Sequence, residues 1–393
     1  MRAFPSRILL LLGLVLVSIL AFGCGGNNGG SQSSQSSQPG SNVQAITVNA
    51  GPNSNYVDGA FTSVTVCSPG SATNCQTIGG ILVDTGSPGL RILSSALTVS
   101  LPQQTDSGGS PIVECGEFGS GFTWGPVETA DVKIAGEQAS SLPIQVIGSP
   151  NFSTIPPNCS QGQQSLNDLT NLGANGLLGV GQSIQDLQTY YACPSLGCTV
   201  TNEGLAQQVQ NPVASFATDN NGVIIELPSV SGAEASVSGS LIFGIGTQSN
   251  NGLGSATVFG TGPFGDFNTT YQSTQYPSFL DSGSNGIFFL DSTTTGLTVC
   301  ADTNLLYCPT FPQTISVLNN AETGTNGASG TASFTVGNAD TLESNPNNTA
   351  INGLAGPQPG SFDFGLPFFF GRNVYVAIDG KSTPGGTGPY TAY

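Results

Sequence analysis

The sequence predicts a mostly β protein with a core large enough for one two-lobed unit or for two ordinary domains. The chain has 393 residues, of which 37% are hydrophobic, so it can bury a substantial core. Its 55 Gly and 25 Pro residues, together with many Ser, Thr and Asn, supply turns, whereas long stretches with helical spacing are scarce. Length alone does not choose between the two arrangements.

The charge balance excludes several classes of function. The chain has six Lys and Arg residues, 23 Asp and Glu residues and no His, which rules out Ser-His-Asp triads, Cys-His dyads and His-ligated zinc. The strongly negative charge makes nucleic acid and anionic membrane surfaces poor partners. Because so few side chains stay positive in acid, an acidic working pH is expected. Ordinary acidity of a secreted protein is the alternative, and activity measured across pH separates the two.

The first segment, residues 1–24, has the layout of a secretory signal: a short basic start with Arg2 and Arg7, an apolar run and then small residues. Its last five residues, Leu-Ala-Phe-Gly-Cys, resemble a bacterial lipobox, in which Cys24 would be lipidated. An ordinary signal-peptidase site before Cys24 is the alternative. We therefore expect an exported protein, either lipid-anchored at the bacterial cell envelope, with the outer membrane as one destination, or periplasmic or extracellular.

Residues 25–42 form a Gly, Ser, Gln and Asn tract without apolar periodicity, which predicts a flexible tether. Beyond Cys24 the chain keeps eight Cys, an even number that suits disulfides in an oxidising compartment. Spacing within the sequence does not prove connectivity. The proposed pairs are Cys67–Cys75, Cys193–Cys198 and Cys300–Cys308, which leaves Cys115–Cys159.

The body of the chain begins with three predicted strands, which lead into a short polar motif. The strands are Ala45–Val48, Gly59–Cys67 and Gly80–Val83. Further along, residues 184–192 and 205–210 are the best helix candidates, the second stopped by a Pro.

The polar motif occurs twice, each time after an apolar approach. The two copies are Asp84-Thr85-Gly86-Ser87 and Asp281-Ser282-Gly283-Ser284. One copy would mean little, because Asp starts many turns. Two copies, separated by about the length of one lobe, are much harder to dismiss.

The composition of the motif suits a pair of carboxyl groups. Two carboxylates within hydrogen-bonding distance cannot both ionise, so they share a proton and titrate together. The ionised member can take a proton from water while the protonated member donates to a developing oxyanion. The Gly lets backbone amides approach the carboxylates, and the hydroxyls supply further donors.

With these motifs the chain resembles the pepsin-like aspartic peptidases, from about Val48 to Asp379. Four further segments match in order: a flap-like hairpin, the apolar segment behind the first Asp loop, the strand leaving the first lobe and the closing segment of the second lobe. These are residues 118–125 with the strand Val127–Ile134 after them, then residues 175–181, 239–244 and 364–379.

The resemblance implies a bilobal pepsin-like acid-protease fold, with two pseudo-twofold-related β lobes, residues 43–248 and 249–393, and a cleft between them. It implies an aspartic endopeptidase with Asp84 and Asp281 as catalytic residues. A peptide or protein would be the substrate, the chain would be a monomer, and no cofactor or metal would be needed. The lipobox, by contrast, implies that a lipid anchor is the only attachment to a membrane.

The resemblance also assigns supporting roles. Thr85 and Ser282 would reach across the lobe boundary, while Ser87 and Ser284 would bond the outer carboxylate oxygens and Gly86 and Gly283 would allow close approach. Phe118, Gly119, Ser120 and Trp124 would form the flap and contact substrate, although a lone Trp is more often core.

Two positions depart from the family pattern. Phe118 stands where the flap usually has Tyr, and Arg91 stands where the Trp partner of that Tyr is usual. The hydroxyl that positions the flap is therefore missing, which would lower rate or change specificity. For Arg91 we expect pairing with a surface carboxylate, with recognition of an acidic substrate group as the alternative.

Three functions remain open. The first is an active aspartic endopeptidase, favoured by two intact motifs. The second is a peptide-binding or protein-binding lipoprotein of the same fold with little or no turnover, supported by the altered flap. The third is a β-rich adhesion or structural lipoprotein in which the two motifs are only turns.

Overall fold

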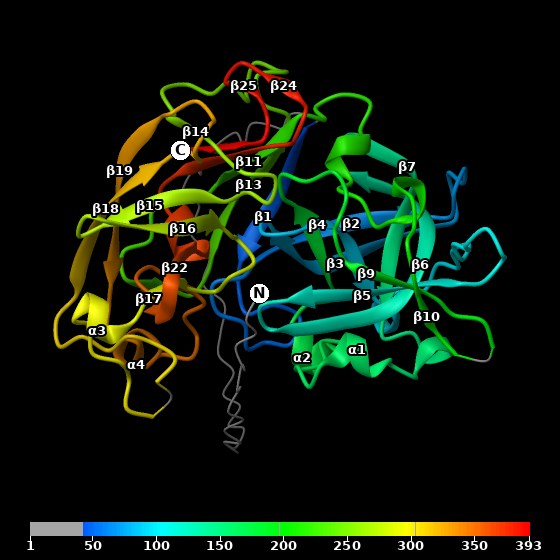
Figure 1. Ribbon diagram of the computed structural model, residues 1–393, viewed down its shortest axis with the longest axis horizontal. Coiled ribbons are helices and arrows are strands. Elements are labelled where there is room, and N and C mark those ends of the chain that lie inside the picture. The colour runs from blue at the N-terminus through cyan, green and yellow to red at the C-terminus, as the bar shows by residue number, and fades with distance from the viewer. Residues whose placement is uncertain (1–41, 196, 303) are drawn as a thin grey trace, which may run out of the picture.

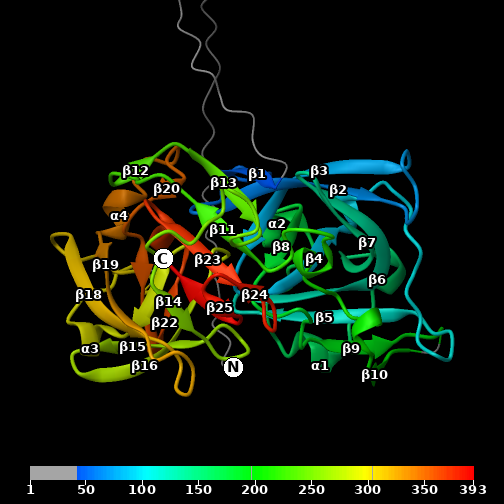
Figure 2. The same cartoon turned by 90° about the horizontal axis from the view of Figure 1, so that it is seen from above.

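The computed structural model describes residues 42–195, 197–302 and 304–393, which are mostly β strand (Figure 1). The predicted signal segment, Cys24 and nearly all of the predicted tether lie outside the described residues. Figure 1 and Figure 2 both show two lobes, one built from the N-terminal half and one mainly from the C-terminal half, beside strands that run between them. The mostly β prediction is confirmed.

The larger sheet found in the described part of the chain has 15 strands in the order β10-β9-β5-β6-β7-β4-β8-β3-β2-β1-β13-β11-β23-β26-β14. These strands are β1 (Val43–Val48), β2 (Ala60–Cys67), β3 (Cys75–Asp84), β4 (Pro88–Leu93), β5 (Ile112–Phe118), β6 (Gly121–Ile134), β7 (Glu137–Ile147), β8 (Gly176–Val180), β9 (Thr189–Ala192), β10 (Thr199–Thr201), β11 (Gly222–Glu226), β13 (Val237–Phe243), β14 (Val258–Gly260), β23 (Asn373–Ala377) and β26 (Tyr390–Ala392).

The second sheet has seven strands over the same described residues, in the order β19-β18-β15-β16-β22-β17-β21. They are β15 (Phe267–Tyr271), β16 (Thr274–Leu280), β17 (Ile287–Leu290), β18 (Gln313–Asn320), β19 (Ser329–Val336), β21 (Ala355–Gly356) and β22 (Gln358–Phe364). Two small pairs complete the strands: β12 (Ala233–Glu234) with β20 (Ala350–Ile351), and β24 (Ser382–Thr383) with β25 (Gly386–Thr387).

The helices are single turns. The α-helices are α1 (Pro157–Ser160), α2 (Leu169–Leu172), α3 (Ser292–Thr295) and α4 (Ala339–Leu342), and the 3₁₀ turns are η1 (Ser94–Ala96), η2 (Pro150–Phe152), η3 (Leu205–Gln207), η4 (Val213–Ser215) and η5 (Leu366–Phe369). In α2 and α3 an Asp side chain caps the first turn and a Gly in the left-handed region follows the last residue, so both ends close within four residues. No helix of the described residues is long and apolar enough to cross a membrane.

Side-chain alternation and strand pairing explain the burial of β18, β19 and β8. β18 and β19 alternate exposed and buried residues, as expected for an antiparallel pair with one face on the core. β8 is buried along its whole length because it lies between β3 and β4. The middle of the large sheet joins distant parts of the chain, since β11 pairs with β13 and with β23.

Each Asp loop follows a strand flanked by a parallel neighbour. β3 ends at Asp84 beside β8, and β16 ends at Leu280 beside β22. In the registers, Leu178 is the partner of Val83 and Phe364 is the partner of Leu280. The two lobes therefore present their Asp loops in equivalent settings.

The strand predictions for residues 45–48, 59–67, 80–83 and 127–134 are confirmed by β1, β2, β3 and β6. The helix prediction for residues 184–192 is wrong, because Thr189–Ala192 is strand β9 and pairs with β5. Pairing along β5 buries Tyr190 and Tyr191, and this tertiary contact overrides local helix propensity. Of residues 205–210, only the 3₁₀ turn η3 is helical.

Four disulfides occur among the described residues, and they join the pairs Cys67–Cys75, Cys115–Cys159, Cys193–Cys198 and Cys300–Cys308. Three of them close local loops, whereas Cys115–Cys159 connects β5 to α1 across 44 positions. Disulfides of this number fit an oxidising compartment outside the cytosol.

Candidate active site

The structure brings the two Asp loops together at the lobe boundary. The carboxyl group of Asp281 lies against Gly86 of the first loop, and the carboxyl group of Asp84 lies against Gly283 of the second. Gly86 lies so close that a Cβ there would be 2.7 Å from Asp281 Cγ, and a Cβ at Gly283 would be 3.1 Å from Asp84 Cγ. A residue with a side chain at Gly86 would therefore displace the opposite carboxyl.

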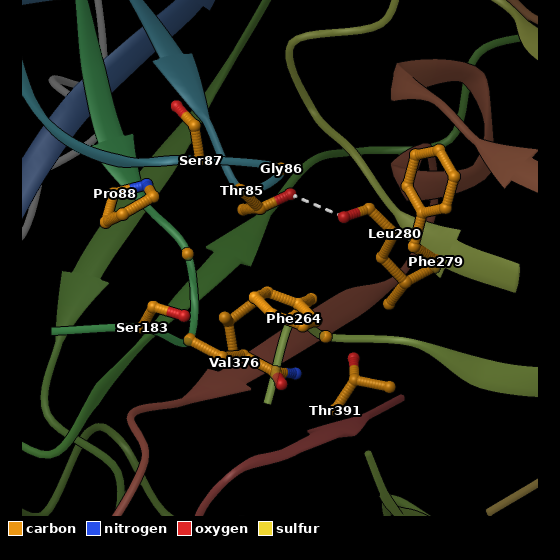
Figure 3. A pocket seen from close by; sticks show the side chains of 13 residues that line it. Thr85, Gly86, Ser87, Pro88, Ser183, Phe264, Phe279, Leu280, Val376 and Thr391 are labelled. Carbon is orange, nitrogen blue, oxygen red and sulfur yellow. Dashed lines mark hydrogen bonds between the residues drawn. The ribbon is translucent and has the colours of Figure 1, made fainter. Parts of the chain in front are cut away.

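Reciprocal hydrogen bonds connect the two loops. Thr85 Oγ1 donates to the Leu280 carbonyl at 3.2 Å, a contact drawn in Figure 3, and accepts from the Ser282 amide at 2.9 Å. Ser282 Oγ donates to the Val83 carbonyl at 2.8 Å and accepts from the Thr85 amide at 3.1 Å. Both hydroxyls are buried, so these bonds fix one Asp loop relative to the other.

Further donors surround each carboxyl group. Asp84 Oδ1 accepts from the amides of Gly86 and Ser87 at 2.7 and 3.2 Å, and its Oδ2 accepts from Ser87 Oγ at 2.5 Å. Asp281 Oδ1 accepts from the Gly283 amide at 2.8 Å, and Ser284 Oγ lies 3.0 Å from Asp281 Oδ2. These donors contact all four carboxyl oxygens and so fix the orientation of both groups.

The electrostatic setting favours one proton on the pair. Burial raises the pKa of Asp84 to about 8, with a further increase from the charge of Asp281, while the bond from Ser87 lowers it. Two adjacent carboxylates in this setting cannot both ionise near neutral pH. The arrangement can therefore supply an acid and a base at the same place.

The hairpin that carries Phe118, Gly119 and Ser120 is the turn between β5 and β6, and its tip points toward the lobe boundary (Figure 1). Neighbouring segments hold both of its strands. β5 pairs with β9 and carries the Cys115–Cys159 disulfide. On β6, Phe122 exchanges backbone hydrogen bonds with residues 164 and 166. This flap is anchored on both edges up to its tip.

The expectation of a surface ion pair for Arg91 is wrong. Arg91 is fully buried, and its Nη2 lies 2.5 Å from Glu114 Oε1 and 2.6 Å from Asp186 Oδ2. Tyr190 Oη donates to Asp186 at 2.6 Å. The guanidinium carbon also lies 5.4 Å from the centre of the Phe118 ring, a cation–π distance. Where the resembled family usually has a Tyr–Trp hydrogen bond, this chain has an Arg–Phe contact next to the turn of the flap.

Trp124 is packed in the core rather than placed for substrate. Its side chain is 2% exposed, and its indole N–H donates to the Phe152 carbonyl at 2.7 Å. The ring meets Tyr191 edge-on at 5.2 Å between centroids. The assignment of Trp124 as a substrate contact is therefore corrected, because the ring has almost no surface left to offer.

Sequence patterns missed Tyr56, whose phenol is influenced by the charges of both acids. Its half-buried ring meets Phe61 edge-on at 5.3 Å. Burial raises the pKa of the Tyr56 phenol, and the charges of Asp281 and Asp84 raise it further. Tyr56 stands in a loop rich in Asn, Asp and Gly, which offers no motif to mark it.

A small cavity of about 50 Å³ opens beside the first Asp loop (Figure 3). It lies between Thr85 and Leu280 of the Asp loops, Ser183, and Val376 and Thr391 of the central strands. Phe264 also lines it and is 65% exposed.

The one cluster of potential metal ligands among the described residues is Cys300, Cys308 and Asp340. Its two sulfur atoms form a disulfide, so they offer no thiolate to an ion. The site built on Asp84 and Asp281 has two carboxyl groups held by their own hydroxyl and amide donors.

Three comparisons place the chain among known proteins. A family model described as "Protein of unknown function (DUF3443)" matches residues 38–393. The solved structure of the aspartic proteinase from Irpex lacteus is similar with a TM-score of 0.53 and 16% sequence identity, over 89% of this chain and 96% of that chain. No curated protein matches the sequence. The structural similarity confirms the predicted bilobal pepsin-like fold.

Proposed function

Because the chain belongs to the DUF3443 family, whose description assigns no activity, we propose a function from the site itself: an aspartic endopeptidase that hydrolyses peptide bonds with a water molecule activated by Asp84 and Asp281. The single observation that carries the proposal is the approach of these two carboxyl groups at the lobe boundary, where Asp84 is buried and each carboxyl group lies against the Gly of the opposite loop. Reciprocal hydrogen bonds through Thr85 and Ser282 support it.

In the proposed mechanism the pair carries one proton when substrate binds. The ionised carboxylate takes a proton from a water molecule as that water attacks the peptide carbonyl, and the protonated carboxyl donates to the carbonyl oxygen. The resulting gem-diol intermediate collapses when the carboxyl proton passes to the leaving nitrogen and one hydroxyl of the gem-diol returns its proton to the carboxylate pair as the C=O bond re-forms. The C–N bond breaks, and the pair is left with one proton again.

The chain's other residues would position the reactants. Ser87 and the amides of Gly86 and Gly283 hold the carboxyl groups, and Phe118 stands at the turn of the flap hairpin. An extended peptide or protein segment is the proposed substrate, and no cofactor takes part. We expect activity in acid, and the pair should lose its proton, and activity with it, as pH rises toward about 8.

The proposal is tested by cleavage of an unfolded protein across acidic to neutral pH. Pepstatin should block cleavage, and Asp84→Ala and Asp281→Ala should each abolish it while the protein stays folded by circular dichroism. Cleavage that survives either substitution would contradict the mechanism.

A peptide-binding protein without turnover is the alternative, favoured by the Arg91–Phe118 contact at the flap in place of the usual Tyr–Trp pair. It predicts that an unfolded chain binds at every pH while no product forms. Binding measured by fluorescence anisotropy, beside product measured by mass spectrometry, separates the two functions.

For the rest of the chain we propose export through the signal at residues 1–24, lipidation of Cys24 and a tether over residues 25–42 that holds two lobes, residues 43–248 and 249–393, at the cell envelope as a monomer. Metabolic labelling with a fatty acid and its loss in Cys24→Ala tests the anchor. Unchanged labelling of that variant would contradict it.

A further inference from the structure

A third carboxyl group touches the site, and it belongs to neither Asp motif. Asp363 stands on β22, where it is the register partner of Phe279 on β16 and of Phe288 on β17. Its side chain is 5% exposed. Ser284 Oγ lies 2.6 Å from Asp363 Oδ2 and 3.0 Å from Asp281 Oδ2. One hydroxyl therefore connects two carboxyl groups.

The number of hydrogens available for these two hydrogen bonds indicates which of the three groups is protonated. The Ser284 hydroxyl has one hydrogen, so it can donate to only one of the two carboxyl groups. If it donates to Asp281, the contact with Asp363 requires a proton on Asp363, which then donates to Ser284 Oγ. The opposite arrangement would leave a buried Asp363 carboxylate beside Asp281 and would remove a donor from Asp281.

The second oxygen of Asp363 supports the neutral form. Asp363 Oδ1 is buried and has no hydrogen-bond partner among the described residues. A buried oxygen without a hydrogen bond has a smaller free-energy penalty when it is the carbonyl oxygen of a neutral acid than when it carries part of the charge of a carboxylate. The geometry on both sides of Asp363 thus favours a protonated group.

The first lobe lacks this feature. Leu177 is the register partner of Leu82 two positions before Asp84, just as Asp363 is the partner of Phe279 two positions before Asp281. Leu177 is buried in an apolar cluster. Asp363 is therefore a polar residue at a position where the repeat has a core residue, and packing alone does not require it.

We propose that Asp363 is a positioning residue of the site: its protonated carboxyl donates to Ser284 Oγ, which in turn donates to Asp281 Oδ2, and loss of the Asp363 proton at higher pH ends this arrangement and activity. The effect on activity rests on the proposed peptidase function, whereas the protonation of Asp363 does not.

The surroundings of Asp363 are consistent with a proton held above the usual range. Burial raises its pKa well above the ordinary value, the charges of Asp281 and Asp84 raise it further, and the Ser284 bond lowers it. Among the described residues of the adjacent elements, β16 contributes the titratable Tyr276, whose ring packs on Phe362, and β17 and η5 contribute none. Arg372, after η5, bonds the carbonyls of Phe368 and Ser333.

The first test reads the proton directly. The full chain is labelled with ¹³C at the Asp carboxyl carbons, and the Asp363 signal is identified by its loss in Asp363→Asn. We expect this signal to keep the chemical shift of a protonated acid at about pH 6, where exposed Asp side chains are ionised. A signal that moves together with exposed Asp residues near pH 4 would overturn the proposal, whether or not the protein cleaves peptides.

The second test measures kcat/KM as a function of pH. Because Asn can donate an N–H to Ser284 at every pH, Asp363→Asn should move the alkaline limb of kcat/KM up by about one pH unit and make it less steep. In a Ser284→Ala background the same substitution should move the limb much less, because the connecting hydroxyl is gone. The proposal would be overturned if the kcat/KM profiles of wild type and Asp363→Asn coincide. It would also be overturned if Asp363→Asn shifts the alkaline limb equally with Ser284 present and with Ser284→Ala. A wild-type protein without cleavage refutes the peptidase proposal alone, and the carboxyl signal still decides the protonation.

Discussion

At the scale of single residues, the site depends on how closely backbone and carboxyl groups approach each other. Gly86 faces the Asp281 carboxyl and Gly283 faces Asp84, and a Cβ at Gly86 would meet all three atoms of the Asp281 carboxyl group within 2.8 Å. This explains in physical terms why each motif needs Gly after its hydroxyl residue. It also gives a substitution that disturbs geometry without removing any chemical group.

We predict that Gly86→Ala lowers kcat/KM by about 100-fold, because a displacement of a reacting group by about 1 Å has an effect of this size. Gly79→Ala on β3 is the control, since a Cβ there would have no atom within 4 Å. Both variants are compared with wild type in the unfolded-protein assay. Equal rates for Gly86→Ala and wild type would contradict the described approach.

Arg91 gives a prediction about stability. Arg91→Gln leaves Glu114 and Asp186 buried without their cation, which should lower the free energy of unfolding by about 3–5 kcal/mol at pH 7. Burial already raises the pKa of Glu114, so the loss should be smaller at pH 4, where Glu114 is neutral. Urea unfolding at both pH values measures it, with Lys133→Gln on β6 as the control. A loss that does not depend on pH would mean that lost packing, and not charge, is responsible.

At this scale, the residues that belong to a short sequence motif could be predicted, and those brought in by the tertiary fold could not. Each Asp motif contains its carboxyl, hydroxyl and Gly residues in consecutive positions, so these site residues could be identified from the sequence. Asp363 is brought to Ser284 by the register of β22 with β16, and Tyr56 stands in an irregular loop. No local sequence pattern predicts either position. Arg91 was noticed, but its partners Glu114 and Asp186 come from distant strands and loops, so its burial could not be foreseen.

At the scale of elements, the flap is the feature that local sequence describes least well. Its hairpin could be predicted from a Gly-Ser-Gly turn between apolar runs. Its anchoring by β9 could not, because residues 184–192 have a helix-like pattern, and the last four of them form a strand only through pairing with β5. The same pairing brings Gln188 to the flap, where its Oε1 accepts from the Glu117 amide at 2.8 Å.

The Cys115–Cys159 disulfide should limit flap motion. We predict that Cys115→Ala with Cys159→Ala speeds amide exchange at residues 118–122 and raises KM more than it lowers kcat. The closed loop spans 44 positions, so its removal should also cost about 4 kcal/mol of stability. Removal of Cys67–Cys75, which closes 8 positions, is the control and should leave flap exchange unchanged. Unchanged flap exchange in the Cys115 and Cys159 double variant would contradict the anchoring role.

At the scale of the whole molecule, few cations accompany many acids, and several acids are buried. Burial is the first cause of a raised pKa at Asp58, Asp84, Glu114 and Asp363. An acid whose pKa is raised on folding holds its proton longer in the folded state than in the unfolded chain. Its contribution to stability is complete below the unfolded pKa of about 4 and is lost as pH rises through the folded pKa.

We therefore predict that the Tm falls as pH rises from about 4 to about 8, the range between the unfolded pKa of an Asp and the pKa of Asp84. Differential scanning calorimetry across this range measures the effect. Asp84→Asn should make the decline shallower, because Asn has no proton to lose. A Tm that rises steadily toward pH 8 would contradict the sign.

The two-lobed fold could be expected once both motifs were seen, since each lobe supplies one carboxyl group. How β1, β13, β11, β23 and β26 join into one sheet could not, because these strands come from both ends and the middle of the chain. Alternating patterns in a single strand do not specify partners so far apart. The contact between Asp84 and Asp281 depends on that assembly.

The most direct measurement of this contact is a double-mutant cycle on kcat/KM with Asp84→Asn, Asp281→Asn and the double variant, assayed on the same unfolded protein. Two carboxyl groups that share one proton act as a unit, so each single substitution should remove nearly as much activity as both together. Losses that multiply, or a single variant that keeps activity close to wild type, would contradict the account.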